Sequence, residues 1–258
     1  MNKFNQKTAD MLLNTLKLIL VFGFVSATLF TMWTPTNILI AQDEPVIQEV
    51  ATANPIQETV AYQIEPEKKI GIIVGHRGYA PEGLPDPGAV CESDGLREVD
   101  LNLQIATLLR QELLEENFMV ELLNEDDPKL VDYQAMAVIS IHNDTCEYLG
   151  DEFSGFQIKP AYKQTNQPEL SERLAACIIN RYENITGLRY LATVSQDMSE
   201  YHAFEKFADD TPSAIMEAGY MLLDKEILTQ NPALIAHGIA EGIRCYVYNE
   251  PINQQPEE

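Results

Sequence analysis

Short apolar runs alternate with amphipathic segments from Lys69 onward, and this alternation restricts the possible folds more than any other feature of the sequence. Four runs have the character of strands: 69–75 (KIGIIVG), 118–123 (FMVELL), 135–142 (AMAVISIH) and 213–219 (SAIMEAG). At least the first, third and fourth are apolar enough to be buried on both faces. Because strands alternate with helices in parallel α/β folds, we predict a single α/β domain with a mostly parallel central sheet flanked by helices.

The segments between and after these runs carry apolar residues at helical spacing. The three sets are Leu101, Ile105, Leu108 and Leu109; Leu170, Leu174, Cys177 and Ile178; and Ile235, Ile239, Ile243 and Tyr246. The last helix is expected to begin with Asn231 as its cap and Pro232 as its first helical residue.

The N-terminus departs from this globular pattern. Residues 16–33 (LKLILVFGFVSATLFTMW) carry a single charge, at Lys17, and are about as long as the 17 to 25 residues that cross a bilayer. Lys3, Lys7 and Lys17 on the N-terminal side predict a cytoplasmic N-terminus and an extracytoplasmic domain anchored to the membrane. A cleaved signal peptide, which would make the protein secreted, is the alternative. We favour the anchor because the apolar core of a signal peptide is usually only about 7 to 15 residues long.

The segment after the apolar stretch has the composition of a spacer. Residues 42–67 contain three prolines, six acidic residues and no helical stripe, so they cannot bury enough surface to offset the entropy of ordering. We therefore divide the chain into a cytoplasmic N-terminus and anchor (1–35), an acidic linker (36–67), a folded domain (68–250) and a polar tail (251–258).

The charge of the chain excludes one class of partner. There are 17 Lys and Arg residues against 40 Asp and Glu, which gives a formal net charge of −23. Recognition of phosphate backbones requires clustered basic residues, so we expect no nucleic-acid partner. A solvated, repulsive surface accounts for the acidity, and we predict a monomer.

Polar residues occur where several of the predicted strands end. In open α/β sheets the functional crevice lies beyond the carboxyl ends of the strands. His76 follows the first strand, His142 ends the third, and Glu217 lies within the fourth. Glu98 opens the first helix on the same face as Leu101, and a carboxylate aimed at a core requires a partner.

Two imidazoles and one carboxylate form the ligand set of catalytic zinc hydrolases, with a fourth position for water. We predict that Zn²⁺ is held by His76, Glu98 and His142, and that Glu217 acts as general base and acid. Taken singly, a histidine at a strand end is usually a hydrogen-bonded turn residue, and Glu98 could be a charge favoured by the helix dipole. Four such coincidences at one sheet edge are much less probable than any one of them.

The motifs around these residues resemble a known family. GHRG, DPGAVC, REVDLNLQIATLLRQEL, SIHND, LSERLAACI and PSAIMEAGYMLLDKEILTQNPALIAHGIAEGIRCY follow one another between about residues 69 and 248. In this order they resemble the zinc-dependent N-acetylmuramoyl-L-alanine amidases of the amidase 3 type. The resemblance implies that His76, Glu98 and His142 are zinc ligands and that Glu217 is catalytic. It also implies hydrolysis of the amide between the lactyl group of N-acetylmuramic acid and L-alanine in cell-wall peptidoglycan.

The sequence departs from the family pattern at several positions. Family members commonly read DPGHGG, whereas here Ile73 and Val74 replace the Asp-Pro pair and Arg77 replaces a glycine. Asp144 stands where asparagine is usual, and an arginine often found after the second strand is missing. None of these changes removes a ligand, so they bear on substrate positioning and rate. The extra loop at 79–91 is either a wall of the substrate cleft or a tolerated surface insertion.

Other functions use the same residues. A degenerate family member could bind wall glycan without turnover, and a zinc peptidase could cleave a different amide. The presence of Glu217 favours an enzyme, because a binding protein needs no general base. His202 and His237 are interpreted as surface or packing residues, although the loop of His202 could reach the crevice.

The four cysteines fall into two groups. Cys91 and Cys146 lie near the predicted catalytic edge, where they could form a disulfide or, alternatively, ligate zinc as thiolates. Cys177 lies on an apolar helical stripe, and we expect it and Cys245 to behave as small buried hydrophobic residues.

Overall fold

The computed structural model of the chain describes residues 68–79, 83–162, 165–193 and 195–252. The predicted anchor and linker lie outside these residues, as does most of the predicted tail. Within the described ranges, no helix has both the length and the apolar character that crossing a membrane requires.

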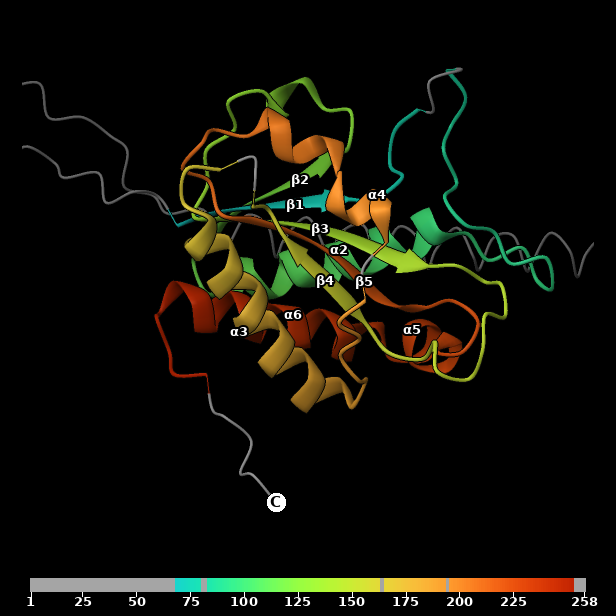
Figure 1. The fold of residues 1–258 in the computed structure, drawn as a ribbon. Coiled ribbons are helices and arrows are strands. Elements are labelled where there is room, and N and C mark those ends of the chain that lie inside the picture. Colours follow the sequence, from blue (N-terminus) through green and yellow to red (C-terminus); the bar gives the residue numbers. More distant parts are fainter. Residues whose placement is uncertain (1–67, 80–82, 163–164, 194, 253–258) are drawn as a thin grey trace, which may run out of the picture. The chain divides into compact units, whose positions relative to one another are not determined.

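The centre of the domain is a five-stranded sheet with the strand order β2-β1-β3-β5-β4 (Figure 1). The strands are β1 (Lys69–Val74), β2 (Met119–Asn124), β3 (Ala137–Asp144), β4 (Gln157–Pro160) and β5 (Ser213–Tyr220). The pairs β1–β2, β1–β3 and β3–β5 are parallel, and β4 is antiparallel to β5. The predicted mostly parallel sheet is confirmed. The edge strand β4 was not predicted, because a four-residue strand is too short to show a period.

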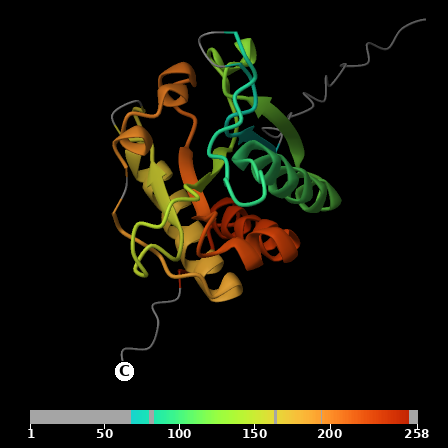
Figure 2. The ribbon, with the colours of Figure 1, turned by 90° about the vertical axis from the view of Figure 1, so that its right-hand side faces the viewer.

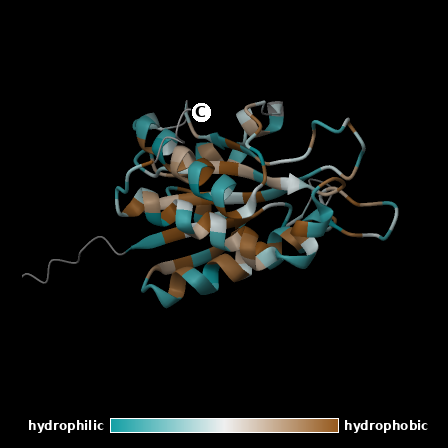
Figure 3. Ribbon diagram, turned by 90° about the horizontal axis from the view of Figure 1, so that it is seen from below, coloured by the Kyte–Doolittle hydropathy of each residue, from teal (hydrophilic) through white to brown (hydrophobic). Residues whose placement is uncertain are grey.

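Three long helices cover one face of this sheet: α2 (Glu98–Glu115), α3 (Pro168–Thr186) and α6 (Pro232–Val247). Figure 3 views this helical layer from below, and hydrophobic and hydrophilic residues alternate along its helices. Most of the predicted stripe residues form the core: Leu101, Ile105, Leu109, Leu174, Ile178, Ile235, Ile239 and Ile243 are buried in one cluster with Ile70 and Ile72. Leu108 and Tyr246 are partly buried against this cluster, and Leu170 is half-buried outside it. Helix α6 begins at Pro232 as predicted, although the Asn231 side chain makes no capping hydrogen bond. The short helix α5 (Lys225–Gln230) precedes α6.

The opposite face is covered by short, irregular elements. These are the 3-10 helix η1 (Pro128–Leu130), the single-turn helix α4 (Gln196–Ser199) and the 3-10 helix η2 (His202–Lys206). Figure 2 shows the orange α4–η2 segment and the red helix α6 on opposite sides of the strands. Successive side chains of a strand point to opposite faces, so Ile72 packs against the long helices while Ile73 packs in the second cluster.

Two disulfides join segments that are distant in the sequence. Cys91–Cys146 links the loop before α2 to the loop after β3, as one of the two alternatives predicted. Cys177–Cys245 links α3 to α6. The prediction that these last two cysteines are merely small hydrophobic residues is wrong. Both lie on apolar helical faces, and a single-sequence pattern does not show that these two faces meet.

Candidate active site

The four predicted site residues gather at the carboxyl edge of the sheet. His76 lies in the turn after β1, Glu98 is the first residue of α2, and His142 and Glu217 are register partners on the adjacent strands β3 and β5. The prediction that His142 ends its strand is wrong, because β3 continues to Asp144. Glu217 lies within its strand as predicted, since β5 continues to Tyr220.

The crevice exists because strand β1 ends earlier than its neighbour β3, the central strand of the sheet. Strand β1 stops at Val74, and the His142 ring lies over Gly75. A Cβ atom at residue 75 would lie 2.5 Å from ring atoms of His142, so only glycine leaves room for the imidazole. The early end of β1 thereby converts a position within β3 into a position at the edge of the crevice.

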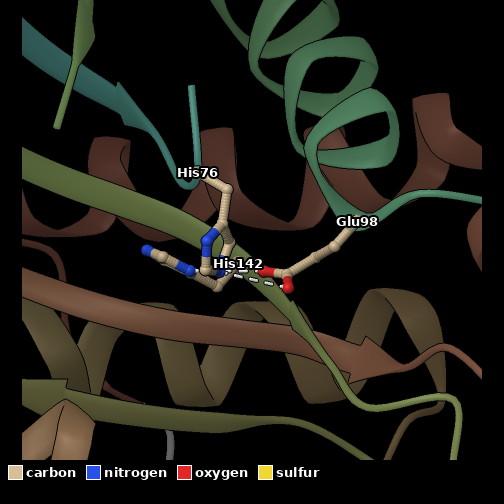
Figure 4. Close-up of side chains that lie close together, drawn as sticks. All are labelled: His76, Glu98 and His142. Atoms are coloured by element: carbon tan, nitrogen blue, oxygen red, sulfur yellow. Dashed lines mark ion pairs between the residues drawn. The ribbon is translucent and has the colours of Figure 1, made fainter. Parts of the chain in front are cut away.

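Figure 4 shows the side chains of His76, Glu98 and His142 converging from three different segments. His76 Nε2 lies 3.2 Å from Glu98 Oε2, and His142 Nδ1 lies 3.3 Å from Glu98 Oε1. One potential ligand atom from each residue falls within 4.8 Å of the others. Two imidazole nitrogens and a carboxylate oxygen suit zinc, so the donor set fits the predicted metal.

Glu98 is held by several donors although it is almost completely buried, with 4% exposure. The backbone N–H of Ala89 donates to Oε2 (3.0 Å), while Oε1 accepts from Asn102 Nδ2 and from the Asn143 backbone N–H (both 3.2 Å). Burial alone would raise the pKa of Glu98. Hydrogen bonds with His142 and His76 outweigh burial and hold this pKa far below its usual range. Glu98 is therefore ionised at neutral pH, as a metal ligand must be.

The DPGA motif supports His76 and Glu98 from the loop between them. Asp86 Oδ2 lies 2.9 Å from His76 Nδ1, so it accepts from the nitrogen that points away from Glu98. Gly88 has φ of 63°, and a Cβ atom there would lie 2.5 Å from Glu98 Oε2 and 2.7 Å from His76 Cδ2. Both the backbone conformation and the lack of space require glycine at this position.

A fifth residue, Glu125, contacts the site from the turn after β2. Its Oε1 lies 3.1 Å from His142 Nε2, a close ion-pair contact in which the N–H is not aligned as a hydrogen bond. Glu125 was not predicted from the sequence. A signal for it exists, because Glu125 lies two residues after the predicted strand 118–123, at the same edge of the sheet.

The carboxylates change the acidity of both imidazoles. Burial alone would lower the pKa of His76, but Glu98 and Asp86 outweigh it and raise this pKa to about 9. Burial likewise opposes the rise at His142, where Glu125 and Glu98 raise the pKa to about 10. At neutral pH and without a metal, both imidazoles are therefore in the charged form with a proton on each nitrogen. A metal must displace one proton from each ring.

Glu217 differs from the other carboxylates of the site. Its Oε2 atom is buried and has no hydrogen-bond partner among the described residues. Burial raises the pKa of Glu217 to about 8, with His142 opposing the shift and Glu98 reinforcing it. A carboxyl group that titrates near neutral pH can both take up and return a proton, which suits general acid–base catalysis.

An open cleft of about 570 Å³ leads to these groups. One wall of the cleft comes from the α4–η2 segment and from Ser195 just before it, and the other comes from the site residues. The residues that line the cleft are His76, Asp86, Glu125, His142, Asp144, Ser195, Asp197, Met198, Glu200, Tyr201, His202, Ile215 and Glu217. His202 thus reaches the crevice, whereas His237 lies on α6 and pairs with Glu112 at 2.8 Å. Of the predicted 79–91 loop, the described part contributes Asp86 to the lining.

Comparisons with known structures agree with this fold. An N-acetylmuramoyl-L-alanine amidase from Clostridium difficile 630 superposes with a TM-score of 0.57 at 20% identity, covering 72% of this chain and 100% of that one. The CwlD amidase from Clostridioides difficile, solved in complex with the GerS lipoprotein, gives 0.55 at 21% identity, with 70% and 99% covered. AmiC2 of Nostoc punctiforme gives 0.50 at 21% identity, with 70% and 98% covered. At these identities the likeness establishes the fold.

The sequence itself gives the family. No curated protein matches it significantly. The family model for N-acetylmuramoyl-L-alanine amidases of the amidase 3 type matches residues 70–245, which is nearly all of the described domain. The chain belongs to this family of peptidoglycan amidases.

Proposed function

We propose that the domain is a zinc-dependent hydrolase that cleaves the amide between the lactyl group of N-acetylmuramic acid and L-alanine of the peptidoglycan stem peptide. The observation that carries this proposal is the convergence of His76 Nε2, Glu98 and His142 Nδ1 beside the buried, unpartnered carboxylate of Glu217. Family membership supports the choice of bond.

The four site residues have two roles: three would bind the metal, and the fourth transfers a proton. His76, Glu98 and His142 would hold the metal, which when bound supplies Lewis acidity and a water of lowered pKa. Glu217 takes the proton from the attacking water and returns it to the amide nitrogen that leaves with L-alanine. The raised pKa of Glu217 makes both transfers accessible near neutral pH.

We place this chemistry outside the cytoplasm. Residues 16–33 would anchor the chain in the membrane, with a secreted form resulting if this segment is cleaved as a signal peptide. Support comes from the disulfides Cys91–Cys146 and Cys177–Cys245, since such bonds persist mainly in oxidising compartments.

The test is mass analysis of purified peptidoglycan after digestion with the purified, zinc-loaded chain. We expect free stem peptides that begin with L-alanine and glycan strands with unsubstituted lactyl groups. The Glu217→Gln variant serves as the inactive control. Binding to the wall without any released product would indicate a degenerate binding protein, and cuts within the stem peptide would indicate a peptidase.

A further inference from the structure

Glu125 contacts two of the three metal-binding residues, and neither contact is needed for the sheet itself. We propose that Glu125 is a positioning residue that fixes the His76 backbone and the His142 ring together. This inference rests on the proposed zinc site.

The first contact fixes the turn that carries His76. Glu125 Oε2 accepts a hydrogen bond of 2.9 Å from the His76 backbone N–H. His76 has φ of 60°, in the left-handed region that residues other than glycine rarely adopt. A conformation of this kind persists only when its surroundings hold it, and Glu125 provides one such restraint.

The second contact acts on the ring of His142. His142 Nδ1 faces Glu98 and the metal position, so Nε2 is the nitrogen that must carry the proton when Nδ1 is a ligand. Glu125 Oε1 lies 3.1 Å from that Nε2. The negative charge of a carboxylate at this distance favours the proton on Nε2, and so selects the tautomer in which Nδ1 is free to bind the metal. A carboxylate beside the outer nitrogen of a metal-binding histidine also strengthens it as a ligand. Asp86 occupies the corresponding position on His76 Nδ1.

Glu125 is itself held in place by the irregular layer of the fold. Tyr201 donates its hydroxyl to Glu125 Oε1 at 2.9 Å, and that hydroxyl also lies 2.8 Å from Ser140 Oγ. Lys206 Nζ donates to the backbone carbonyl of Glu125 at 3.0 Å. The α4–η2 segment, which lines the cleft, is therefore connected to the metal site through one carboxylate.

Glu125 is not a fourth ligand in this arrangement. It faces His142 Nε2, whereas the metal position faces His142 Nδ1 across the ring. Its effect on the metal must pass through the two histidines.

The experiment compares Glu125→Gln with Glu121→Gln in the full chain. Glu121 is a matched control, because it lies on β2 close to Glu125 in the sequence and also accepts from a tyrosine hydroxyl (Tyr133, 2.8 Å), but it pairs with Lys69 and does not line the cleft. Zinc affinity is measured by competition with a chromophoric chelator, and the visible spectrum of the Co²⁺-substituted protein reports ligand geometry. Glu125→Gln should weaken zinc binding by roughly 10- to 100-fold and alter the Co²⁺ spectrum, while Glu121→Gln should do neither.

A second variant guards against a folding defect. Tyr201→Phe keeps the Glu125 carboxylate but removes one of its donors, so we expect a smaller loss of zinc affinity with the same direction of spectral change. Wild-type zinc affinity and an unchanged Co²⁺ spectrum in both variants would overturn the positioning role alone. Failure of the wild-type chain to bind zinc at all would overturn the proposed function as well.

Discussion

The two faces of the sheet are covered in different ways. One face packs against α2, α3 and α6, whose aliphatic side chains recur at helical spacing. The other packs against short elements and irregular backbone, through aromatic residues such as Tyr133, Phe204 and Phe207. This second layer also contains polar groups: Ser140, Tyr201 and Glu125 form a hydrogen-bonded chain that ends beside His142. Regular packing serves stability, and the irregular layer carries the cleft.

The candidate metal site lies where the two layers meet. Glu98 enters from the helical layer, while His142 lies on the other face, as its edge-on contact with the Tyr201 ring at 5.9 Å shows. The next residue, Asn143, points the opposite way, and its side chain donates to Asn102 of α2 at 2.8 Å. Consecutive residues of β3 therefore serve the metal site from both faces.

The largest predicted effect is that of pH on zinc affinity, which depends on the site residues. His76 and His142 have raised pKa values of about 9 and about 10 without metal, so below those values each ring holds a proton that zinc must displace. Glu98 has a lowered pKa and stays ionised, so it adds no dependence. Zinc affinity should therefore rise with pH toward 9, by up to about tenfold per pH unit for each imidazole.

Calorimetry in buffers of different ionisation enthalpy would count the protons released on zinc binding. Release of close to two protons at pH 7 is expected, because this pH lies well below both pKa values. A count of zero would mean that the rings are already neutral and that the carboxylate contacts are weaker than the geometry suggests.

The next largest predicted effect is on turnover, and it separates the catalytic role of Glu217 from metal binding. Glu217→Gln should lower turnover by about two to four orders of magnitude, because the amide cannot transfer the proton. Zinc content and thermal stability should stay close to wild type, since Glu217 is not among the converging ligands. Elemental analysis beside product assays gives the answer, with Glu121→Gln as the active control. Loss of zinc in Glu217→Gln would make this residue a ligand.

The sequence allowed the helical layer and the convergence of the candidate site residues to be predicted, for different reasons. Periodicity identifies α2, α3 and α6 because their stripes are long, and residue chemistry identifies His76, Glu98 and His142 because together they form a possible ligand set for zinc. The α4–η2 segment has no period, so nothing in the sequence indicates that Tyr201 folds back onto Glu125. Such contacts depend on tertiary packing of irregular backbone, which local patterns do not encode.

The disulfides provide a direct comparison of the two regions. Their sequence separations are 55 residues for Cys91–Cys146 and 68 for Cys177–Cys245, so loss of either should destabilise the fold by a similar amount, about 2–5 kcal/mol. Of the two disulfides, only Cys91–Cys146 includes a residue close in sequence to Ala89, whose backbone N–H donates to Glu98 Oε2.

We therefore expect the double variant Cys91→Ala, Cys146→Ala to weaken zinc binding roughly tenfold, through loss of outer support for a ligand. The double variant Cys177→Ala, Cys245→Ala should leave zinc affinity unchanged. Denaturant unfolding and chelator competition on both variants measure the two quantities separately. Equal zinc affinities would show that the loop holds Glu98 without its disulfide.

The smallest predicted effect is a loss of stability caused by a change within the helical layer. Gly242 of α6 lies so close to α3 that a Cβ atom there would be 2.5 Å from Ile178 Cα, which is backbone and cannot move aside alone. Gly242→Ala should therefore force α3 and α6 apart and destabilise the fold by about 1–3 kcal/mol, partly offset by the better helix propensity of alanine. The cleft lies on the other side of the sheet, so turnover per folded molecule and zinc affinity should be unchanged. A thermal melt combined with a product assay well below the melting temperature checks both expectations. A fall in turnover without a fall in stability would show that the spacing of α3 and α6 is transmitted through the sheet to the site, and that the two faces are not independent.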